Sequence, residues 1–375
     1  MARTLPTPEG KLNPAYDPTI DFIRFIAFFL VFFTHFINRG GNAITVNAGQ
    51  WWENEFIQRV ADFGGQGVTL FFSLTGFLLG RLLIREYKEQ GTVSVKAFYF
   101  RRILRIWPLY FAFIGMCAVL NIFSNSPTLV SSELPYLATF TYNWGQIYGN
   151  IPGTMATITW SISVEEQIYL LFPVLFLLMA KKSATKYAIF LIIAGFSSVL
   201  SCIYIFEISA DRFTPAFLLP VGVGLLTASY EDKYFTRPKA LWNSLLIILL
   251  LILYILTFRD IVSSSIFQSI SYIGSAFLLP ALLLICRSLI GKNQNGAIKL
   301  AVYIGRRSYG CYLFHWAIWT VMVGRSIFST ESGGFSVIGV LVGFTTTVLV
   351  SSFSYKYFET PFLRFRKRFQ KVLSP

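Results

Sequence analysis

The chain has 375 residues, of which 54% are hydrophobic and only 13% are charged, and its mean hydropathy is +0.58. Soluble domains carry about twice that charged fraction, so the composition excludes an ordinary soluble globular protein. The net charge of +14 has a simple source, because membrane proteins collect Lys and Arg in cytoplasmic loops, and no nucleic-acid partner is predicted.

Long apolar runs predict an all-α polytopic membrane protein with about ten transmembrane helices in one bundle, since about 20 apolar residues in a helix cross the hydrocarbon core. The predicted spans are residues 19–37, 66–84, 104–123, 157–180, 186–206, 213–230, 240–258, 266–287, 299–323 and 335–358. They form one transmembrane domain, residues 19–360. A cytoplasmic segment, 1–18, precedes it, and a basic cytoplasmic tail, 361–375, follows it.

The basic residues predict the orientation of these spans. With both termini in the cytoplasm, the inner segments hold 27 of the 32 Lys and Arg residues. Positive charge collects on the cytoplasmic side, so this asymmetry favours both termini inside. The longest outer segment, 124–156, holds no run long enough to span the bilayer. The four cysteines lie in apolar segments without metal-ligand spacing, and no metal site is predicted.

The first predicted span, "FIRFIAFFLVFFTHF", carries two ionisable residues, Arg24 and His35. They are eleven positions apart, which is about three helical turns, so both lie on one face and about 16 Å apart in depth. Arg24 has a structural explanation, because it can extend toward the head groups or pair with Asp21. His35 can also be an interhelical hydrogen-bonding group. Ionisable groups within a span are otherwise functional-site candidates.

Other polar residues are expected at the depth of His35. Glu165 lies about two turns below the outer surface, and its neighbours one turn away on the same face are Ser161 and Tyr169. The second and ninth spans bring further polar groups to this level, namely Ser73, Thr75 and His315. Together they predict a polar pocket beneath the outer leaflet. The alternative is that several of them make unrelated interhelical contacts.

Three arginines cluster at the cytoplasmic start of the third span, in "FYFRRILRIWPLY": Arg101, Arg102 and Arg105. The simpler interpretation is a topology signal that contacts anionic lipids. The second is a phosphate-binding site, because guanidinium groups match phosphate oxygens in geometry and charge.

Six sequence stretches in order give the chain a family resemblance. They are Arg24 followed eleven positions later by His35, and then "FFSLTGFL", "RRILRIWPLY", "WSISVEEQIYLLFP", "SYGCYLFH" and "ETPF". From about residue 17 to 365 the chain resembles the acyltransferase-3 family of integral-membrane O-acyltransferases. Thr75 stands where the family usually has Ser.

The resemblance implies an activity and a location. It implies transfer of an acyl group, usually acetyl, from cytosolic acyl-CoA to a hydroxyl group of an acceptor, usually a glycan. Acetyl-CoA is then a co-substrate, and no permanently bound cofactor is expected. The implied location is the inner (plasma) membrane of a bacterium, crossed many times. The first-helix histidine, His35 here, is taken in the family as the catalytic residue.

The chemistry of acyl transfer assigns roles to the polar residues. An imidazole suits the removal of a proton from an acceptor hydroxyl, so His35 is predicted to act as the base, directly or after forming an acyl-imidazole. Glu165 is predicted to orient this imidazole or to hold the acceptor, and Ser73 or Thr75 to donate to the thioester oxygen. The predicted donor-binding residues are Arg24, Arg101, Arg102 and Arg105. The remaining predicted lining residues are Ser161, Tyr169, Tyr309 and His315.

Two other function classes fit some of these features. A transporter or flippase of a polar or lipid-linked substrate also has many spans and buried charges, but such proteins usually show internal repeats, and none is found here. A membrane scaffold or signalling protein has no need for His and Glu at one depth. Binding of acyl-CoA to the purified protein distinguishes the enzyme from both.

Overall fold

The structure is a computed structural model that describes residues 16–38, 63–123, 127–149, 151–180, 183–206, 208, 210–231, 248, 272–290, 295–324 and 337–369. Within these residues all regular structure is helical and no strand occurs. Six helices are long and apolar enough to cross a membrane, by length and composition. An all-helical, multi-pass membrane protein is therefore confirmed. The total of ten spans and the cytoplasmic location of both termini stay predictions.

The first five predicted spans are occupied by five long helices. These are α1 (Pro18–Asn38), α3 (Gly67–Gln90), α4 (Val95–Phe123), α7 (Trp160–Ala180) and α8 (Ala184–Tyr204). The predicted start of the third span at residue 104 is wrong, because α4 begins at Val95. Ser94 explains this start, since its hydroxyl accepts a hydrogen bond from the amide of Ala97, as helix N-caps do. The hydropathy pattern missed the polar first turns, which carry Arg101 and Arg102.

The second half of the chain holds shorter elements. They are α9 (Leu218–Ser229), α13 (Leu278–Ile290), α14 (Gly296–Gly305), α15 (Ser308–Gly324), α16 (Val337–Ser354), a π-helical turn (Tyr355–Glu359) and α17 (Thr360–Arg366). The predicted span at 240–258 lies outside the described residues apart from residue 248.

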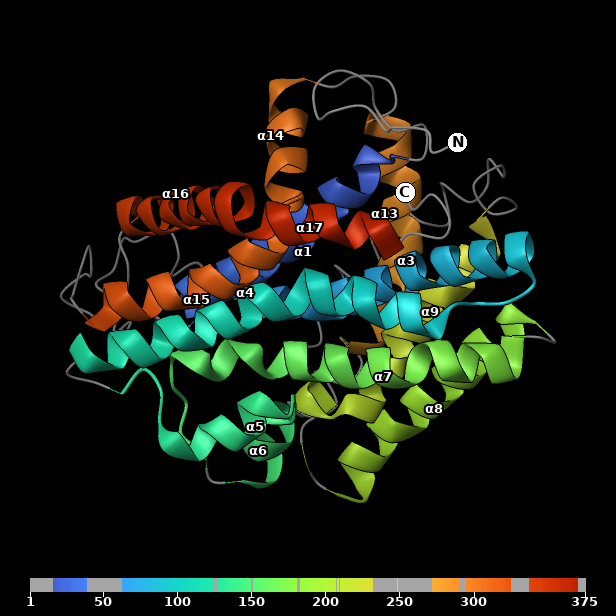
Figure 1. Cartoon of the computed structure of the whole chain (residues 1–375), viewed down its shortest axis with the longest axis horizontal. Helices are drawn as coiled ribbons and strands as arrows, with labels where there is room; N and C mark the ends of the chain where they lie inside the picture. The colour runs from blue at the N-terminus through green and yellow to red at the C-terminus, as the bar shows by residue number, and fades with distance from the viewer. Residues whose placement is uncertain are drawn as a thin grey trace.

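The predicted single span at 299–323 is wrong, because the chain turns within it. Helix α14 ends at Gly305 and α15 begins at Ser308, and the two axes diverge (Figure 1). Gly305 lies against the backbone of Asp21 in α1, where a β-carbon would have no room. Arg306 donates a hydrogen bond from Nε to Asp21 at 3.1 Å, so the turn fixes α14 to α1. The sequence of this segment is an apolar run interrupted by Arg306 and Arg307, and its hydropathy did not predict the turn.

The outer segment 124–156 forms short helices, as its lack of a spanning run predicted. Two of them, α5 (Leu134–Ala138) and α6 (Tyr142–Tyr148), lie beside the first half of α7 (Figure 1). Trp144 donates from Nε1 to Gln167 of α7 at 2.9 Å, and Tyr110 of α4 donates to the carbonyl of Leu137 at 2.9 Å. These bonds fix the segment against the middle of α4 and the first half of α7.

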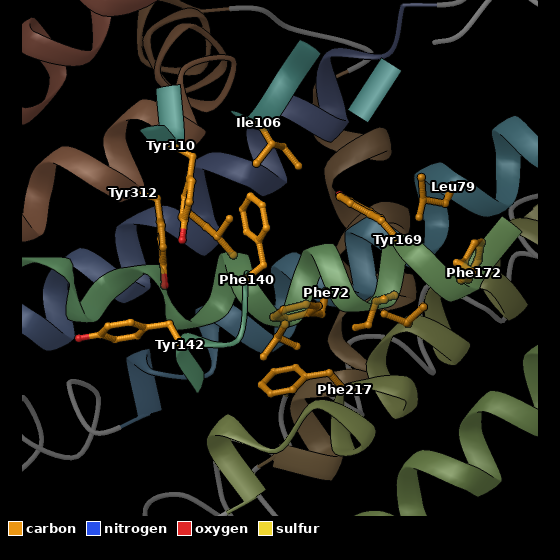
Figure 2. Close-up of a cluster of buried hydrophobic side chains, with 14 of the residues drawn as sticks. Phe72, Leu79, Ile106, Tyr110, Phe140, Tyr142, Tyr169, Phe172, Phe217 and Tyr312 are labelled. Carbon is orange, nitrogen blue, oxygen red and sulfur yellow. The ribbon is translucent and has the colours of Figure 1, made fainter. Parts of the chain in front are cut away.

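The largest buried apolar cluster joins α3, α4, α7, α9 and α15 (Figure 2). Phe72 of α3 packs on Phe217, with ring centroids 4.3 Å apart, and Tyr312 of α15 reaches the same cluster. Burial of aromatic rings at this density gives the helices a fixed relative position. That position matters because Tyr169 and Tyr312 belong both to this cluster and to the polar cavity described below.

Helices α3 and α9 approach each other through glycines. Gly76 and Gly80 of α3 are spaced as in small-xxx-small contacts of membrane helices, and they face Val221 and Leu225 of α9. Gly224 of α9 lies against the backbone of α3 at Ser73 and Phe77. Without side chains between them, the two backbones come close enough for extended van der Waals contact.

We expect Gly224→Ala to destabilise the protein by about 1–3 kcal/mol, because its β-carbon would meet backbone atoms of α3 that cannot move aside. The matched control is Gly115→Ala in α4, where nothing lies within 4 Å of the added carbon and helix propensity improves. Thermal unfolding of both variants in detergent checks this. A Gly224→Ala variant that melts at or above Gly115→Ala would contradict the close contact.

Candidate functional site

An interhelical cavity of about 100 Å³ opens between α1, α3, α4, α7 and α15. Eight of the twelve predicted site residues line it, namely Arg24, Thr75, Arg102, Arg105, Ser161, Glu165, Tyr169 and Tyr309. The other four, His35, Ser73, Arg101 and His315, lie outside its lining. Residues more than 280 positions apart in the sequence therefore meet at one place. No finding tests the roles assigned to them, which stay predictions.

Arginines give the cavity a positive charge. Arg24 donates from Nη1 to Asp21 at 2.8 Å, which confirms the pair expected from their spacing. Arg102 lies over the ring of Tyr169, with its guanidinium carbon 5.2 Å from the centroid, and its Nε is buried without a hydrogen-bond partner among the described residues. Among the residues that the structure describes, no carboxylate lies within ion-pair distance of Arg102 or Arg105. These two guanidinium groups therefore have no ion-pair partner among the described residues.

A fourth arginine reaches this region from the C-terminal helix. Arg366 of α17 lies close enough to all three cavity arginines for their charges to interact. Helix α17 packs against α4, which explains the approach. Arg366 falls in the predicted cytoplasmic tail, residues 361–375, and no role was predicted for it. A basic tail after the last span is so common a topology signal that its composition alone did not single out Arg366.

Glu165 forms the acidic side of the cavity. It accepts a hydrogen bond from Thr75 of α3 at 3.4 Å and another from Tyr169, one turn along α7. Its neighbour Glu166 faces another way and accepts from Trp107 of α4 at 3.1 Å. The predicted proximity of Thr75, Glu165 and Tyr169 is therefore confirmed.

The two histidines of the chain form a pair. Nδ1 of His35 in α1 lies 2.8 Å from Nε2 of His315 in α15, and the rings stack with centroids 5.1 Å apart. Nδ1 of His315 lies 3.2 Å from the carbonyl oxygen of Cys311. His315 is fully buried, whereas His35 is partly exposed. The side chain that contacts His35 here is thus the imidazole of His315, whereas Glu165 contacts Thr75 and Tyr169.

Tyr312 connects the histidine pair with the cavity, and sequence reasoning missed it. Its ring lines the cavity and lies 5.7 Å, centroid to centroid, from that of His315. Its hydroxyl shares a 2.7 Å hydrogen bond with Ser161 of α7. Tyr312 precedes His315 by three positions, so the helical spacing was a signal that could have found it.

Two predicted site residues make structural contacts instead of lining the cavity. Arg101 donates to Glu86 at 3.3 Å and to the carbonyl of Phe369 at 2.8 Å, which connects α3, α4 and the end of the chain. Ser73 donates to the carbonyl of Ala276 at 3.1 Å. Arg102 and Leu74, the next residues in sequence, do line the cavity. Successive residues of a helix point about 100° apart, so Arg101 and Ser73 face other helices. A residue next to a cavity-lining residue in sequence is therefore not expected to line the cavity itself.

The helices and the cavity define a polytopic membrane protein with a site between its helices that is lined by arginines. The chain belongs to the Acyl_transf_3 family, described as an acyltransferase domain, whose model matches residues 17–356. The family membership predicted from the six sequence stretches is confirmed.

Two O-acetyltransferases are similar to almost the whole of this chain. The peptidoglycan O-acetyltransferase OatA of Listeria monocytogenes is 24% identical over 379 residues, which cover 94% of this chain and 56% of that protein. The O-acetyltransferase OatA of Staphylococcus aureus is 24% identical over 378 residues, covering 94% of this chain and 58% of that protein. The chain thus spans somewhat more than half the length of these relatives. No solved structure matches it significantly.

Proposed function

We propose that the protein is a membrane O-acyltransferase. It moves an acyl group from acyl-CoA, with acetyl-CoA as the expected donor, to a hydroxyl group of an extracytoplasmic or membrane-associated acceptor. The observation that carries this proposal is the arginine-lined cavity, which adjoins the histidine pair through Tyr312. The family and the names of the relatives support the same chemistry. The name of the Listeria relative makes a cell-wall glycan the first acceptor to test, and a bacterial plasma membrane the expected location.

The donor fits the cavity by charge. CoA carries phosphate groups at one end and the thioester at the other, and guanidinium groups bind phosphate oxygens in pairs. Arg102 and Arg105 lie on successive turns of α4 and take the phosphates in this proposal, with Arg366 beside them. Arg24, already paired with Asp21, lies along the path of the pantetheine arm. The thioester then lies deeper, near Thr75 and Tyr312.

The histidine pair supports a definite protonation pattern. A carbonyl oxygen accepts hydrogen bonds and never donates, so Nδ1 of His315 carries the proton toward Cys311. In a neutral pair Nε2 of His315 is then an acceptor, and Nδ1 of His35 donates to it. Nε2 of His35 is left with the lone pair, and it is the atom that acts as base or nucleophile. His315 is thus a positioning residue for His35.

Both predicted routes use that nitrogen. In direct transfer, the acceptor hydroxyl gives its proton to Nε2 of His35 while its oxygen attacks the thioester carbon; the C–S bond then breaks and CoA leaves as the thiol with that proton. In the covalent route, Nε2 attacks the thioester carbon, the C–S bond breaks, and CoA leaves as the thiolate from an acyl-imidazolium. The acceptor oxygen then attacks the acyl carbon, the N–C bond breaks, and the proton of the acceptor hydroxyl passes to the CoA thiolate. Thr75 has one hydroxyl proton, which in the structure points to Glu165; in this scheme it turns to the carbonyl oxygen as negative charge develops. Glu165 keeps its hydrogen bond from Tyr169 and serves the acceptor.

The purified protein in proteoliposomes tests this function. With [¹⁴C]acetyl-CoA and an N-acetylglucosamine oligosaccharide as the glycan probe, we expect radioactive acetyl on the sugar and release of CoA thiol. Binding of acetyl-CoA in detergent is the part of the test that needs no acceptor. Absence of any acetyl-CoA binding, or movement of the sugar across the membrane without acetylation, would favour the transporter class instead.

The tautomer of His35 is testable on its own, because the chain has only two histidines. In ¹⁵N-histidine spectra we expect Nδ1 of His35 protonated and Nε2 unprotonated, with His315→Gln leaving a single ring to assign. His315→Ala should lower the transfer rate about 10–100-fold by removing the acceptor for Nδ1–H, whereas His315→Gln, whose amide oxygen accepts, should restore most of it. A proton on Nε2 of His35 in the wild type would overturn the assignment.

A further inference from the structure

A second hollow, of about 390 Å³, lies at the surface where the α14–α15 turn meets the end of α16. We call it the interfacial hollow. It shares no residue with the interhelical cavity. Two cations and four aromatic side chains line it, together with Ser352 and Thr360, and none of the described carboxylates does. The cations are Arg307 and Lys356.

Arg307 is held in place for an anionic partner. Its guanidinium carbon lies 3.4 Å from the ring centroid of Tyr303 and 4.9 Å from that of Tyr355, so it is stacked between two rings. Nη1 donates to the carbonyl of Tyr303 at 2.7 Å, which fixes the plane of the group. Nε is buried and has no hydrogen-bond partner among the residues that the structure describes. A guanidinium group held between two rings in this way binds a phosphate with little loss of side-chain entropy.

Lys356 supplies the second charge. Its Nζ lies 4.9 Å from the ring centroid of Tyr357, and both side chains are exposed. The acidic residue of the π-helical turn, Glu359, is buried and accepts a hydrogen bond from Ser354. Glu359 acts on Arg307 through its charge but does not line the hollow. The hollow therefore remains positively charged.

An exposed apolar stripe leads along α16 to this hollow. Its members recur at helical spacing and are each about three-fifths or more exposed: Ile338, Leu341, Leu349 and Phe353. Helix α16 lies at the edge of the helix assembly in Figure 1 and is a candidate membrane span. A stripe of this kind on a span faces acyl chains. Phe353 belongs both to the stripe and to the hollow, so apolar surface and positive charge are continuous.

We propose that the interfacial hollow binds the phosphate head group of an anionic phospholipid, whose acyl chains lie along the α16 stripe. Basic pockets between membrane helices recognise such head groups, and aromatic side chains are typical of the membrane interface. A free phosphate would use the same two cations but would leave the stripe without a role. The proposal is independent of the acyltransferase function, because the two sites share no residue.

Native mass spectrometry of the detergent-purified protein tests this site. With phosphatidylglycerol and phosphatidylcholine offered together, we expect selective retention of phosphatidylglycerol. Lys356→Gln should lower its retention about fivefold, which is the contribution of one cation near a lipid head group, and Arg307→Gln should lower it further. The control is Lys299→Gln, an exposed lysine of α14 outside the hollow, which should leave retention unchanged. Lys356 is exposed, so its variant is expected to fold.

Three results would overturn the proposal. They are equal retention of the two lipids, retention unchanged in both Lys356→Gln and Arg307→Gln, and displacement of phosphatidylglycerol by inorganic phosphate alone, which would make the hollow a site for the free anion. Because no activity is measured, a failed acyl-transfer assay has no bearing on this outcome.

Discussion

Replacing His35 with Ala is expected to abolish acyl transfer, lowering the rate by about 10²–10⁴ or more. Removal of a general base costs about that factor, and in the covalent route the nucleophile is lost as well. The measurement is the rate of acetyl transfer from [¹⁴C]acetyl-CoA to the glycan probe in proteoliposomes. A rate near that of the wild type would rule out both routes through this imidazole.

The control for this variant is donor binding. His35 does not line the interhelical cavity, whose arginines remain in place, so the affinity for acetyl-CoA should change by less than about threefold. Loss of binding together with loss of transfer would point to a folding defect. His35→Gln, which keeps a polar side chain beside His315, then separates the two causes. It should fold, bind acetyl-CoA and still fail to transfer.

The helices of the first half were predictable because each is a single apolar run bounded by polar loops. The errors came where local contacts outweighed hydropathy. Ser94 starts α4 two turns before the apolar run, and Gly305 ends α14 where it meets α1. Neither contact has a signature in the hydropathy of the segment. The close contact of a small residue with another helix depends on tertiary packing, so it is seen only in the folded structure.

The sequence predicted most of the polar residues that line the candidate site, but it did not predict which side chains contact one another. Depth follows from position along a helix, and this placed Thr75 and Glu165 together correctly. It also placed His35, Ser73 and His315 in the same pocket, and these three lie outside the cavity lining. The direction in which a residue faces depends on how each helix is rotated against its neighbours, and one sequence does not give this rotation. Glu165 was predicted to orient His35 or to hold the acceptor, and His315 only to line the site, whereas the imidazole of His35 contacts that of His315.

The second large effect is expected on the KM for acetyl-CoA when the arginines of α4 are replaced. Substituting both Arg102 and Arg105 by Gln should raise the KM for acetyl-CoA about a hundredfold or more, since each hydrogen-bonded contact with a charged partner contributes about 1.5–3 kcal/mol. The kcat at saturating donor should change far less, because neither residue reaches the histidine pair in the proposed scheme. Steady-state kinetics with varied acetyl-CoA measure both quantities.

A donor without phosphates makes this prediction specific. Acetyl-pantetheine keeps the thioester but lacks the phosphate groups of CoA, so the wild type should prefer acetyl-CoA and the double variant should lose that preference. Arg364→Gln, at an exposed position of α17, is the matched control and should behave as the wild type. Arg102→Lys keeps the charge without the guanidinium fork, and we expect an intermediate KM. If the double variant still prefers acetyl-CoA by the wild-type factor, the phosphates bind elsewhere, and the cavity arginines serve a ligand of a different kind.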